Sequence, residues 1–280
     1  MKLQGIFSSI ATPFDHLGNL YQAKVEHNVA KWNRTTLSGY VAGGWAGEGA
    51  MLSGAEKVRL WEWVAQWAAA EKILICASGA PSVHETVELT NRAAGIGYKA
   101  ALIAQPLPAN GTPLYYRAVA DQSKLPVIIG GDVAAETVAL LSEHPNIVAV
   151  KEGCGDPEKL ARLLRDAKKG FSVLGGSAAS LWPALQAGAT GAIVGFASAA
   201  PYACITIWEA HRMRESEACE DWQKRISEAA RLVTGKYGVA GLKHAMEING
   251  YYGGPPRLPL TAPDAEAKRE IETAFAEIKG

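Results

Sequence analysis

The feature that most constrains the fold is a repeat, in which short apolar runs alternate with longer helical patterns. The predicted strands cover residues 6–11, 39–42, 73–77, 100–104, 127–129, 147–150, 172–174 and 192–194. Helical patterns between them cover residues 22–33, 55–70, 83–94, 134–142, 157–167 and 181–187. Continuously apolar strands in this order are typical of a parallel sheet covered by helices. Eight such units predict an α/β fold, a closed (β/α)₈ TIM barrel, and no GxGxxG follows the first strand to favour a dinucleotide-binding sheet.

The rhythm changes after the eighth predicted strand. Residues 201–214, 217–233, 240–248 and 265–278 read as helices with no strand between them. We therefore expect residues 1–200 to form the barrel and residues 201–280 to form a C-terminal helical extension. This extension should pack on the barrel or on a neighbouring subunit. No low-complexity linker divides the chain.

Charge and composition exclude several classes of partner. The 280 residues contain 28 lysines and arginines and 28 aspartates and glutamates, so the net charge is zero. Nothing here favours nucleic acid or an anionic membrane. The amino terminus is no signal peptide and no apolar run is long enough to cross a membrane, so we expect a cytoplasmic protein. A net charge near zero is compatible with a homo-oligomer, a tetramer or a dimer.

The cysteines are too scattered to form a metal site or a disulfide framework. The chain has four of them, with no CxxC pair and no histidine at ligand spacing: Cys76, Cys154, Cys204 and Cys219. We expect no metal and no cofactor.

Lys151 is the first candidate for chemistry. It follows the apolar residues 147–150 and precedes Glu152. At the carboxyl end of a barrel strand, an amine lies where such barrels keep their active sites. Desolvation lowers the pKa of an amine and makes it a nucleophile towards carbonyl compounds. The alternative is a strand-end lysine that simply reaches into water.

A glycine-rich segment after the second predicted strand is the next candidate. It runs from Gly43 through Trp45 and Ala46 to Glu48. Glycines allow the backbone N–H groups to converge on a ligand, and such a nest suits a small carboxylate. An ordinary tight turn would have the same composition, but both this segment and Lys151 would open on the same face of the barrel.

These segments resemble the dihydrodipicolinate synthase and N-acetylneuraminate lyase family. The matching segments are 11–14 (Ala-Thr-Pro-Phe), 44–48 (Gly-Trp-Ala-Gly-Glu), 150–152 (Val-Lys-Glu) and 175–178 (Gly-Gly-Ser-Ala). Residues 237–243 and 250–255 most resemble the 4-hydroxy-2-oxoglutarate aldolase branch. The resemblance covers nearly the whole chain. It implies a (β/α)₈ barrel, usually tetrameric, whose lysine forms a Schiff base with pyruvate or a related 2-oxo acid.

The resemblance also assigns site residues. Lys151 matches the Schiff-base lysine, and Trp45 and Ala46 occupy the positions where the family holds the 2-oxo carboxylate through two small polar residues. Ile193 matches a backbone contact from the eighth strand. The neutral lysine amine adds to the ketone and the adduct loses water, leaving an iminium, which withdraws electrons so that a carbon–carbon bond can break or form.

The sequence departs from the family in the same pocket. Gly130 stands where the family has an acid–base tyrosine, and the loop that follows is shortened. Residues 105–108 lack the family's paired tyrosines, and Trp45 and Ala46 cannot donate hydroxyl hydrogen bonds. Condensation of pyruvate with aspartate semialdehyde is therefore expected to be very slow or absent.

Several residues are candidates to replace the tyrosine, although each also has an ordinary structural interpretation. They are Asp132 beside Gly130, Glu48, Glu152, and the pair Tyr115 and Tyr116 at the start of a predicted helix. The histidines His84, His144 and His244 have surface or packing contexts.

Three functions remain open from the sequence. The first is a Schiff-base-forming lyase of aldolase or synthase type, with atypical proton-transfer groups. The second is a non-catalytic family member that binds a 2-oxo acid or a protein partner. A metal-dependent aldolase is disfavoured because no ligand cluster is visible. If the chain is a lyase, Lys151 should project into the barrel mouth with little exposure, and the Trp45 ring should fill part of the pocket.

Overall fold

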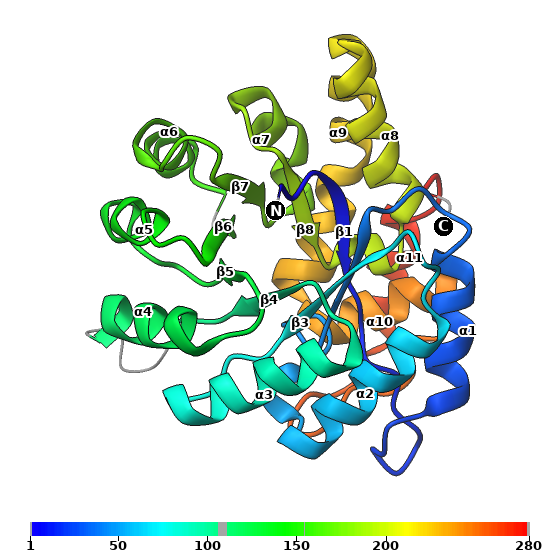
Figure 1. Ribbon diagram of the computed structural model, residues 1–280. Coiled ribbons are helices and arrows are strands. Elements are labelled where there is room, and N and C mark those ends of the chain that lie inside the picture. Colours follow the sequence, from blue (N-terminus) through cyan, green and yellow to red (C-terminus); the bar gives the residue numbers. More distant parts are fainter. Residues whose placement is uncertain (1, 106–110, 154, 279–280) are drawn as a thin grey trace.

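Eight parallel strands close into a barrel, as the repeat predicts (Figure 1). The computed structural model describes residues 2–105, 111–153 and 155–278. The strands are β1 (Gly5–Ser9), β2 (Gly39–Ala42), β3 (Ile73–Ala77), β4 (Ala100–Ile103), β5 (Val127–Ile129), β6 (Ile147–Glu152), β7 (Ser172–Gly175) and β8 (Gly191–Val194). β1 pairs with β2 on one side and with β8 on the other, which closes the ring.

Helices connect the strands and surround the barrel (Figure 1). They are α1 (Gln22–Trp32), α2 (Gly54–Trp67), α3 (Val83–Ile96), α4 (Thr112–Gln122), α5 (Ala135–Ser142), α6 (Pro157–Asp166), α7 (Leu181–Ala187) and α8 (Pro201–Met213). Serine caps illustrate why they begin where they do. The Ser53 hydroxyl accepts the Glu56 amide at the start of α2, and Ser82 does the same for Glu85 at α3. Each cap satisfies a helix N–H group that has no partner within the helix.

Two apolar clusters divide the core. Ten residues fill the inside of the barrel, among them Phe7, Val41, Leu102, Ala149 and Ile193. The larger cluster lies between the outer face of the strands and the helices. Because side chains alternate along a strand, every second residue of each strand faces the interior.

The C-terminal helices pack against residues 178–180 and 196–198, which follow β7 and β8 (Figure 1). They are α9 (Ser216–Arg231), α10 (Gly238–Ile248) and α11 (Ala265–Ala274), with a π-helical turn at Leu232–Lys236 between α9 and α10. α8 contacts both β1 and α7, so it completes the ring of helices around the strands. The division of the chain at residue 200 stays a prediction.

Candidate active site

Lys151 faces the interior of the barrel from the carboxyl end of β6. Ala149 belongs to the interior cluster, and the alternation along the strand gives Lys151 the same direction. Its side chain is partly exposed and lines a cavity of about 390 Å³. The apolar lead-in to Lys151 predicts this position.

The surroundings of Lys151 lower the pKa of its amine. Burial lowers the pKa of its amine below the usual range, and the negative charge of Glu152 opposes that effect. The Glu152 side chain points out of the barrel, since it follows Lys151 directly in the strand. A larger fraction of Lys151 is therefore neutral at a given pH than for an exposed lysine.

The residues at the level of Lys151 are nearly all small. By the same alternation, the other seven strands place Ser9, Gly44, Ala77, Ala104, Gly130, Gly176 and Gly195 around the mouth. On β2 the backbone turns at Gly43, which has a φ of +77°, so that Gly44 faces inward. A Cβ on Gly44 would lie 3.0 Å from the Ser9 hydroxyl and 3.8 Å from the Ala77 methyl. We call these seven residues the small-residue ring; its lack of bulk leaves space above the barrel core.

The cavity extends from this ring towards β7, β8 and α9. The described residues that line it are Ser9, Trp45, Lys151, Gly153, Gly176, Ser177, Ala178, Ala179, Gly195, Phe196, Arg231, Thr234 and Gly235. In the part of the chain that the structure describes, none of the lining residues comes from β3, β4 or β5. The open space thus lies away from Gly130, where the family has its tyrosine.

Arg231, Thr234 and Gly235 form a wall of the cavity that the sequence analysis did not predict. These residues lie at the end of α9 and in the π-helical turn, three and four positions apart, so they share one helix face. Turns of this kind occur often at functional sites. Which face of α9 meets the barrel depends on long-range packing, although the glycine at 235 is a local signal.

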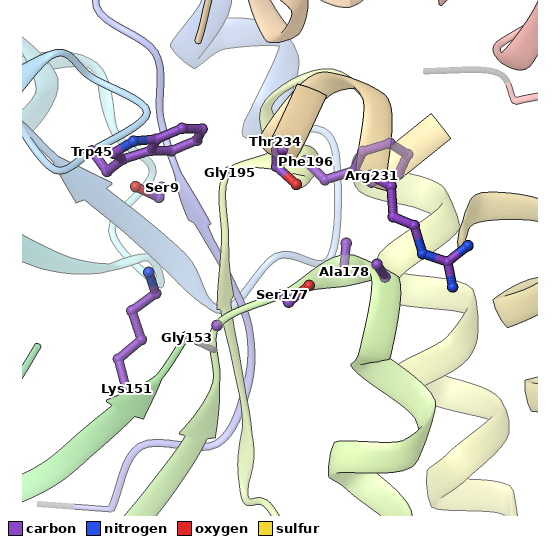
Figure 2. Close-up of a pocket in the computed structure, with 13 residues that line it drawn as sticks. Ser9, Trp45, Lys151, Gly153, Ser177, Ala178, Gly195, Phe196, Arg231 and Thr234 are labelled. Carbon is purple, nitrogen blue, oxygen red and sulfur yellow. The ribbon is translucent and has the colours of Figure 1, made fainter. Parts of the chain in front are cut away.

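Trp45 lies at the rim of the cavity. Its ring is 54% exposed and approaches Gly195, where an added Cβ would lie 3.7 Å from the ring atom Cζ3. Figure 2 shows the ring above Ser9, with the Lys151 amine pointing towards the same space. Trp45 therefore borders the opening of the cavity.

Ala46 and Ile193 are buried behind the cavity wall. A Cβ added to Gly195 would lie 3.1 Å from the Ala46 methyl group. Ile193 belongs to the cluster inside the barrel. Neither is among the described lining residues, so any contact with a ligand would come through the backbone. The hydrogen bonds between described residues include no acceptor for the amides of Trp45 and Ala46, which are free to donate to a ligand.

Glu48 anchors this glycine-rich loop and takes no part in the cavity. Its carboxylate is buried, with Oε1 2.6 Å from the Lys243 Nζ atom, and Oε2 accepts the Arg257 amide at 2.7 Å. The Lys243 amine also donates to the Pro255 carbonyl at 2.9 Å. Burial lowers the pKa of Lys243, and the Glu48 charge opposes this. The loop is thereby tied to α10.

Two hydroxyls in the cavity have no partner among the described residues, those of Ser9 and Ser177. Thr234, by contrast, donates its hydroxyl to the Ala230 carbonyl at 2.6 Å. Ser9 was missed from the sequence because nothing local marks it. Its importance follows only from the barrel, which places it in the small-residue ring with Lys151.

The carboxylates considered as replacement acids are engaged elsewhere. Asp132 is exposed and its carboxylate lies 2.5 Å from the Lys159 amine, which lowers the pKa of Asp132. Glu152 lies 3.8 Å from the same amine and accepts the Gly155 amide at 3.0 Å. Neither residue is among the described residues that line the cavity.

The two tyrosines are buried near the carboxyl ends of β3, β4 and β5. The Tyr115 hydroxyl donates to the Ala80 carbonyl at 2.8 Å, and that of Tyr116 lies 2.9 and 2.8 Å from the Ile103 and Gly130 carbonyls. Burial raises the pKa of both tyrosines. Neither of them lines the cavity. Of the segment 105–108, only Gln105 lies within the described residues.

The histidines are also outside the cavity. His84 is exposed, His144 contacts Asp121 at 3.0 Å, and His244 contacts Glu272 at 3.1 Å. Across the described ranges, no three histidine, cysteine, aspartate or glutamate side chains are grouped to hold a metal ion. Nor does any helix in those ranges have the length and hydropathy to cross a membrane. Cys76, Cys204 and Cys219 are free and buried, while Cys154 lies outside the described residues.

Comparisons with known proteins agree with this architecture. The 4-hydroxy-tetrahydrodipicolinate synthase of Methanothrix thermoacetophila is 30% identical, over 99% of this chain and 98% of that protein. A probable mitochondrial 4-hydroxy-2-oxoglutarate aldolase of Emericella nidulans is 34% identical, over 73% of this chain and 70% of the relative. The solved dihydrodipicolinate synthase of Bacillus anthracis superposes with a TM-score of 0.94 at 23% identity, covering all of both chains.

A family model also matches nearly the whole chain. The model of the dihydrodipicolinate synthetase family matches residues 2–278. The match includes the barrel, the cavity and the C-terminal helices. The chain therefore belongs to the dihydrodipicolinate synthase family.

Proposed function

We propose that this protein is a class I aldolase-type lyase or synthase, in which Lys151 forms a Schiff base with pyruvate or a related small 2-oxo acid. The observation that supports this most is the direction of Lys151. Its amine enters the cavity at the mouth of the barrel, and burial lowers its pKa. The membership in a family of synthases and aldolases supports the same reaction class.

The chemistry begins with attack by the neutral amine on the ketone carbon. The resulting carbinolamine loses water to give an iminium, whose positive nitrogen accepts the electrons of an adjacent carbon–carbon bond. The iminium can also lose a proton from the neighbouring carbon to give an enamine, which then attacks an aldehyde. Either direction needs groups that hold and move protons.

The chain offers its own donors for the 2-oxo acid. We propose that the carboxylate accepts hydrogen bonds from the free amides of Trp45 and Ala46, with Ile193 contributing through its backbone. The Ser9 hydroxyl lies in the same ring as Lys151 and is placed to donate to the carbinolamine oxygen. We propose that Ser9 replaces part of the hydrogen bonding that the family obtains from hydroxyl groups at the positions of Trp45 and Ala46.

The competing proposal is a family member that binds a 2-oxo acid without turnover. It is supported by the absence of a carboxylate, histidine or tyrosine among the described lining residues. Imine formation would then proceed slowly through water, and no carbon–carbon bond would change.

Borohydride reduction tests the proposal directly. With pyruvate present, the reduced imine should add the pyruvate-derived group to the intact chain, and peptide mapping should locate it at Lys151. The K151M variant, which has no amine at this position, is the control. A chain whose mass is unchanged under conditions that label a known family member would refute the Schiff base. If the adduct forms, a search for aldol cleavage products separates the lyase from the non-catalytic alternative.

We also propose a homo-oligomer, a tetramer or a dimer, in a cytoplasmic setting, from the resemblance. Light scattering on the purified chain tests the assembly.

A further inference from the structure

A second cation, Arg231, lines the cavity at the side of the C-terminal helices, and its side chain is exposed. Figure 2 shows Lys151 rising from β6 on one side of the view, while Arg231 extends from the end of α9 on the other, passes beside the segment of Ala178 and turns its guanidinium away from Lys151. Both residues line the cavity. The described lining residues include these two cations and no carboxylate. The cavity is thus locally positive in a chain whose net charge is zero.

Other cations on α9 and the turn after it are neutralised. Lys224 pairs with Glu220 at 2.8 Å, and Arg225 pairs with Asp221 at 2.8 Å, each with a carboxylate four residues earlier. Arg231 has Ser227 at that spacing. No hydrogen bond or ion pair joins Arg231 to any residue that the structure describes.

Carboxylates near the cavity are committed to other partners. Glu152 and Asp132 both contact Lys159. Glu270 accepts hydrogen bonds from Lys236 and from the Tyr237 hydroxyl. Glu228 lies three residues before Arg231 on α9, but no ion pair joins the two, so the exposed guanidinium is accessible to an external anion.

The surroundings of Arg231 suit such an anion. The π-helical turn places Thr234 and Gly235 beside it, and glycine leaves room for a ligand. The free hydroxyl of Ser177 lines the same wall and can donate. A guanidinium stays protonated at any physiological pH and binds carboxylate or phosphate oxygens through two parallel N–H groups. The cavity volume of about 390 Å³ also lies in the range of small-ligand sites, about 300–1,000 Å³.

We propose that Arg231 is a specificity-determining residue, which binds an anionic group at the end of the substrate remote from Lys151. The site would then select 2-oxo acids that carry a second carboxylate or a phosphate-type group over those with an apolar end. This inference rests on the proposed function, since Lys151 must hold the 2-oxo head for the other end to reach Arg231. Ser177 assists as a hydrogen-bond donor.

Three matched acids test the inference through borohydride trapping at Lys151. They are 2-oxopentanoate, 2-oxoglutarate and 2-oxo-4-phosphonobutanoate, which differ at the far end as methyl, carboxylate and phosphonate. At least one of the two charged acids should reach half-maximal trapping at a concentration about tenfold lower than 2-oxopentanoate does. A tenfold difference is the size of effect expected from one charge-assisted hydrogen bond. The order of the two charged acids identifies the preferred anion.

Variants assign the preference to Arg231. In R231Q the preference for the charged acid over 2-oxopentanoate should fall to within about twofold. R231K keeps the positive charge but not the bidentate hydrogen-bonding geometry, so it should retain part of the preference for the charged acid. The matched control is R225Q, which removes an arginine from the same helix outside the cavity and should keep the full preference.

The outcomes separate the two proposals. If pyruvate is trapped but the parent chain shows no preference, or R231Q keeps it, the role of Arg231 is wrong and the Schiff base stands. If no acid is trapped at Lys151, the proposed function falls, and the inference about Arg231 falls with it.

Discussion

At the scale of single residues, Lys151 combines a position suited to chemistry with a cost to stability. A buried amine is destabilising while it is charged, because the folded protein solvates it less well than water does. The same burial gives the neutral, nucleophilic form on which a Schiff base depends. Function and stability therefore oppose each other at this residue.

The K151M variant should be more stable than the parent chain. The pKa of Lys151 is lower in the folded state than in the unfolded state, where it is about 10.5. The penalty is fully present below the folded pKa and disappears as the pH rises to the unfolded value. We expect a gain of about 1 kcal/mol near neutral pH, as is common when a destabilising group is removed, and it should shrink as the pH rises towards 10.5. Urea unfolding at several pH values measures it, and a loss of stability at neutral pH would contradict the burial argument.

Gly130 leads to a prediction about activity. A positioned acid–base group contributes roughly a hundred- to ten-thousand-fold to rate. With glycine at this position, condensation of pyruvate with aspartate semialdehyde should be slower than in tyrosine-bearing relatives by a factor of that order. A coupled assay alongside such a relative measures it. Comparable rates would mean that another group, from Ser9 or from a neighbouring subunit, supplies the proton transfer.

At the scale of elements, the packing of β5 against β4 limits which side chains residue 130 can carry. A Cβ on Gly130 would lie 3.0 Å from the Ile103 carbonyl oxygen and 3.0 Å from Leu102 Cδ1. Both neighbours belong to β4, so a side chain here needs the two strands to shift. The tyrosine that the family resemblance implies at this position would therefore need β4 and the Leu102 side chain to move slightly.

The G130A variant should lose about 1–2 kcal/mol of unfolding free energy, because the added methyl group is crowded by β4. G153A is the matched control, since a Cβ on Gly153 would meet nothing within 4 Å. It should stay within about 0.5 kcal/mol of the parent. Chemical denaturation of both variants measures the difference. Equal stabilities would show that β4 and β5 can move apart at little cost to make room for the methyl group.

The loop after β2 depends on a buried ion pair for its position. In E48Q, the Lys243 amine would face a neutral amide in a buried setting, and we expect a loss of about 3 kcal/mol. E56Q provides a comparison, because Glu56 pairs with Arg257 at a partly exposed site. Its loss should be near 1 kcal/mol or less. If both variants lose the same amount, burial of the Glu48–Lys243 pair is not what stabilises the loop.

The sequence predicted the strands and the place of Lys151 well, since both depend on local apolar runs and on alternation. It did not predict Ser9, Arg231 or Thr234 as cavity residues. Ser9 has no local signal, and Arg231 belongs to an amphipathic helix whose register against the barrel is decided by tertiary packing. The ion pair between Glu48 and Lys243 could not be predicted either, because the two residues are 195 positions apart in the sequence.

At the scale of the whole molecule, the barrel and the C-terminal helices form one packed unit. The Phe196 ring lies 5.5 Å from that of Phe275. The Asn28 side chain exchanges two hydrogen bonds, each 2.8 Å, with the backbone of Tyr252. The cavity itself is lined from both parts of the chain.

A chain truncated after residue 200 should therefore fail to fold cooperatively. It would lose α8, which contacts β1, and would expose the apolar surface now covered by α10 and α11. Thermal unfolding followed by near-ultraviolet circular dichroism tests this, with the full chain as reference. A sharp transition in the fragment would show that residues 1–200 are an independent domain.

The small-residue ring also has a stereochemical consequence. Lys151 is the one large side chain at its level, and the other seven strands present a hydroxymethyl group, a methyl group or a bare backbone. The planar enamine that the proposed Schiff base would give has two faces, which are approached from opposite sides of the barrel. An acid introduced on one side would protonate one face, and an acid on the opposite side would protonate the other. The handedness of a product would then depend on which strand carries the acid, while the lysine stays in place.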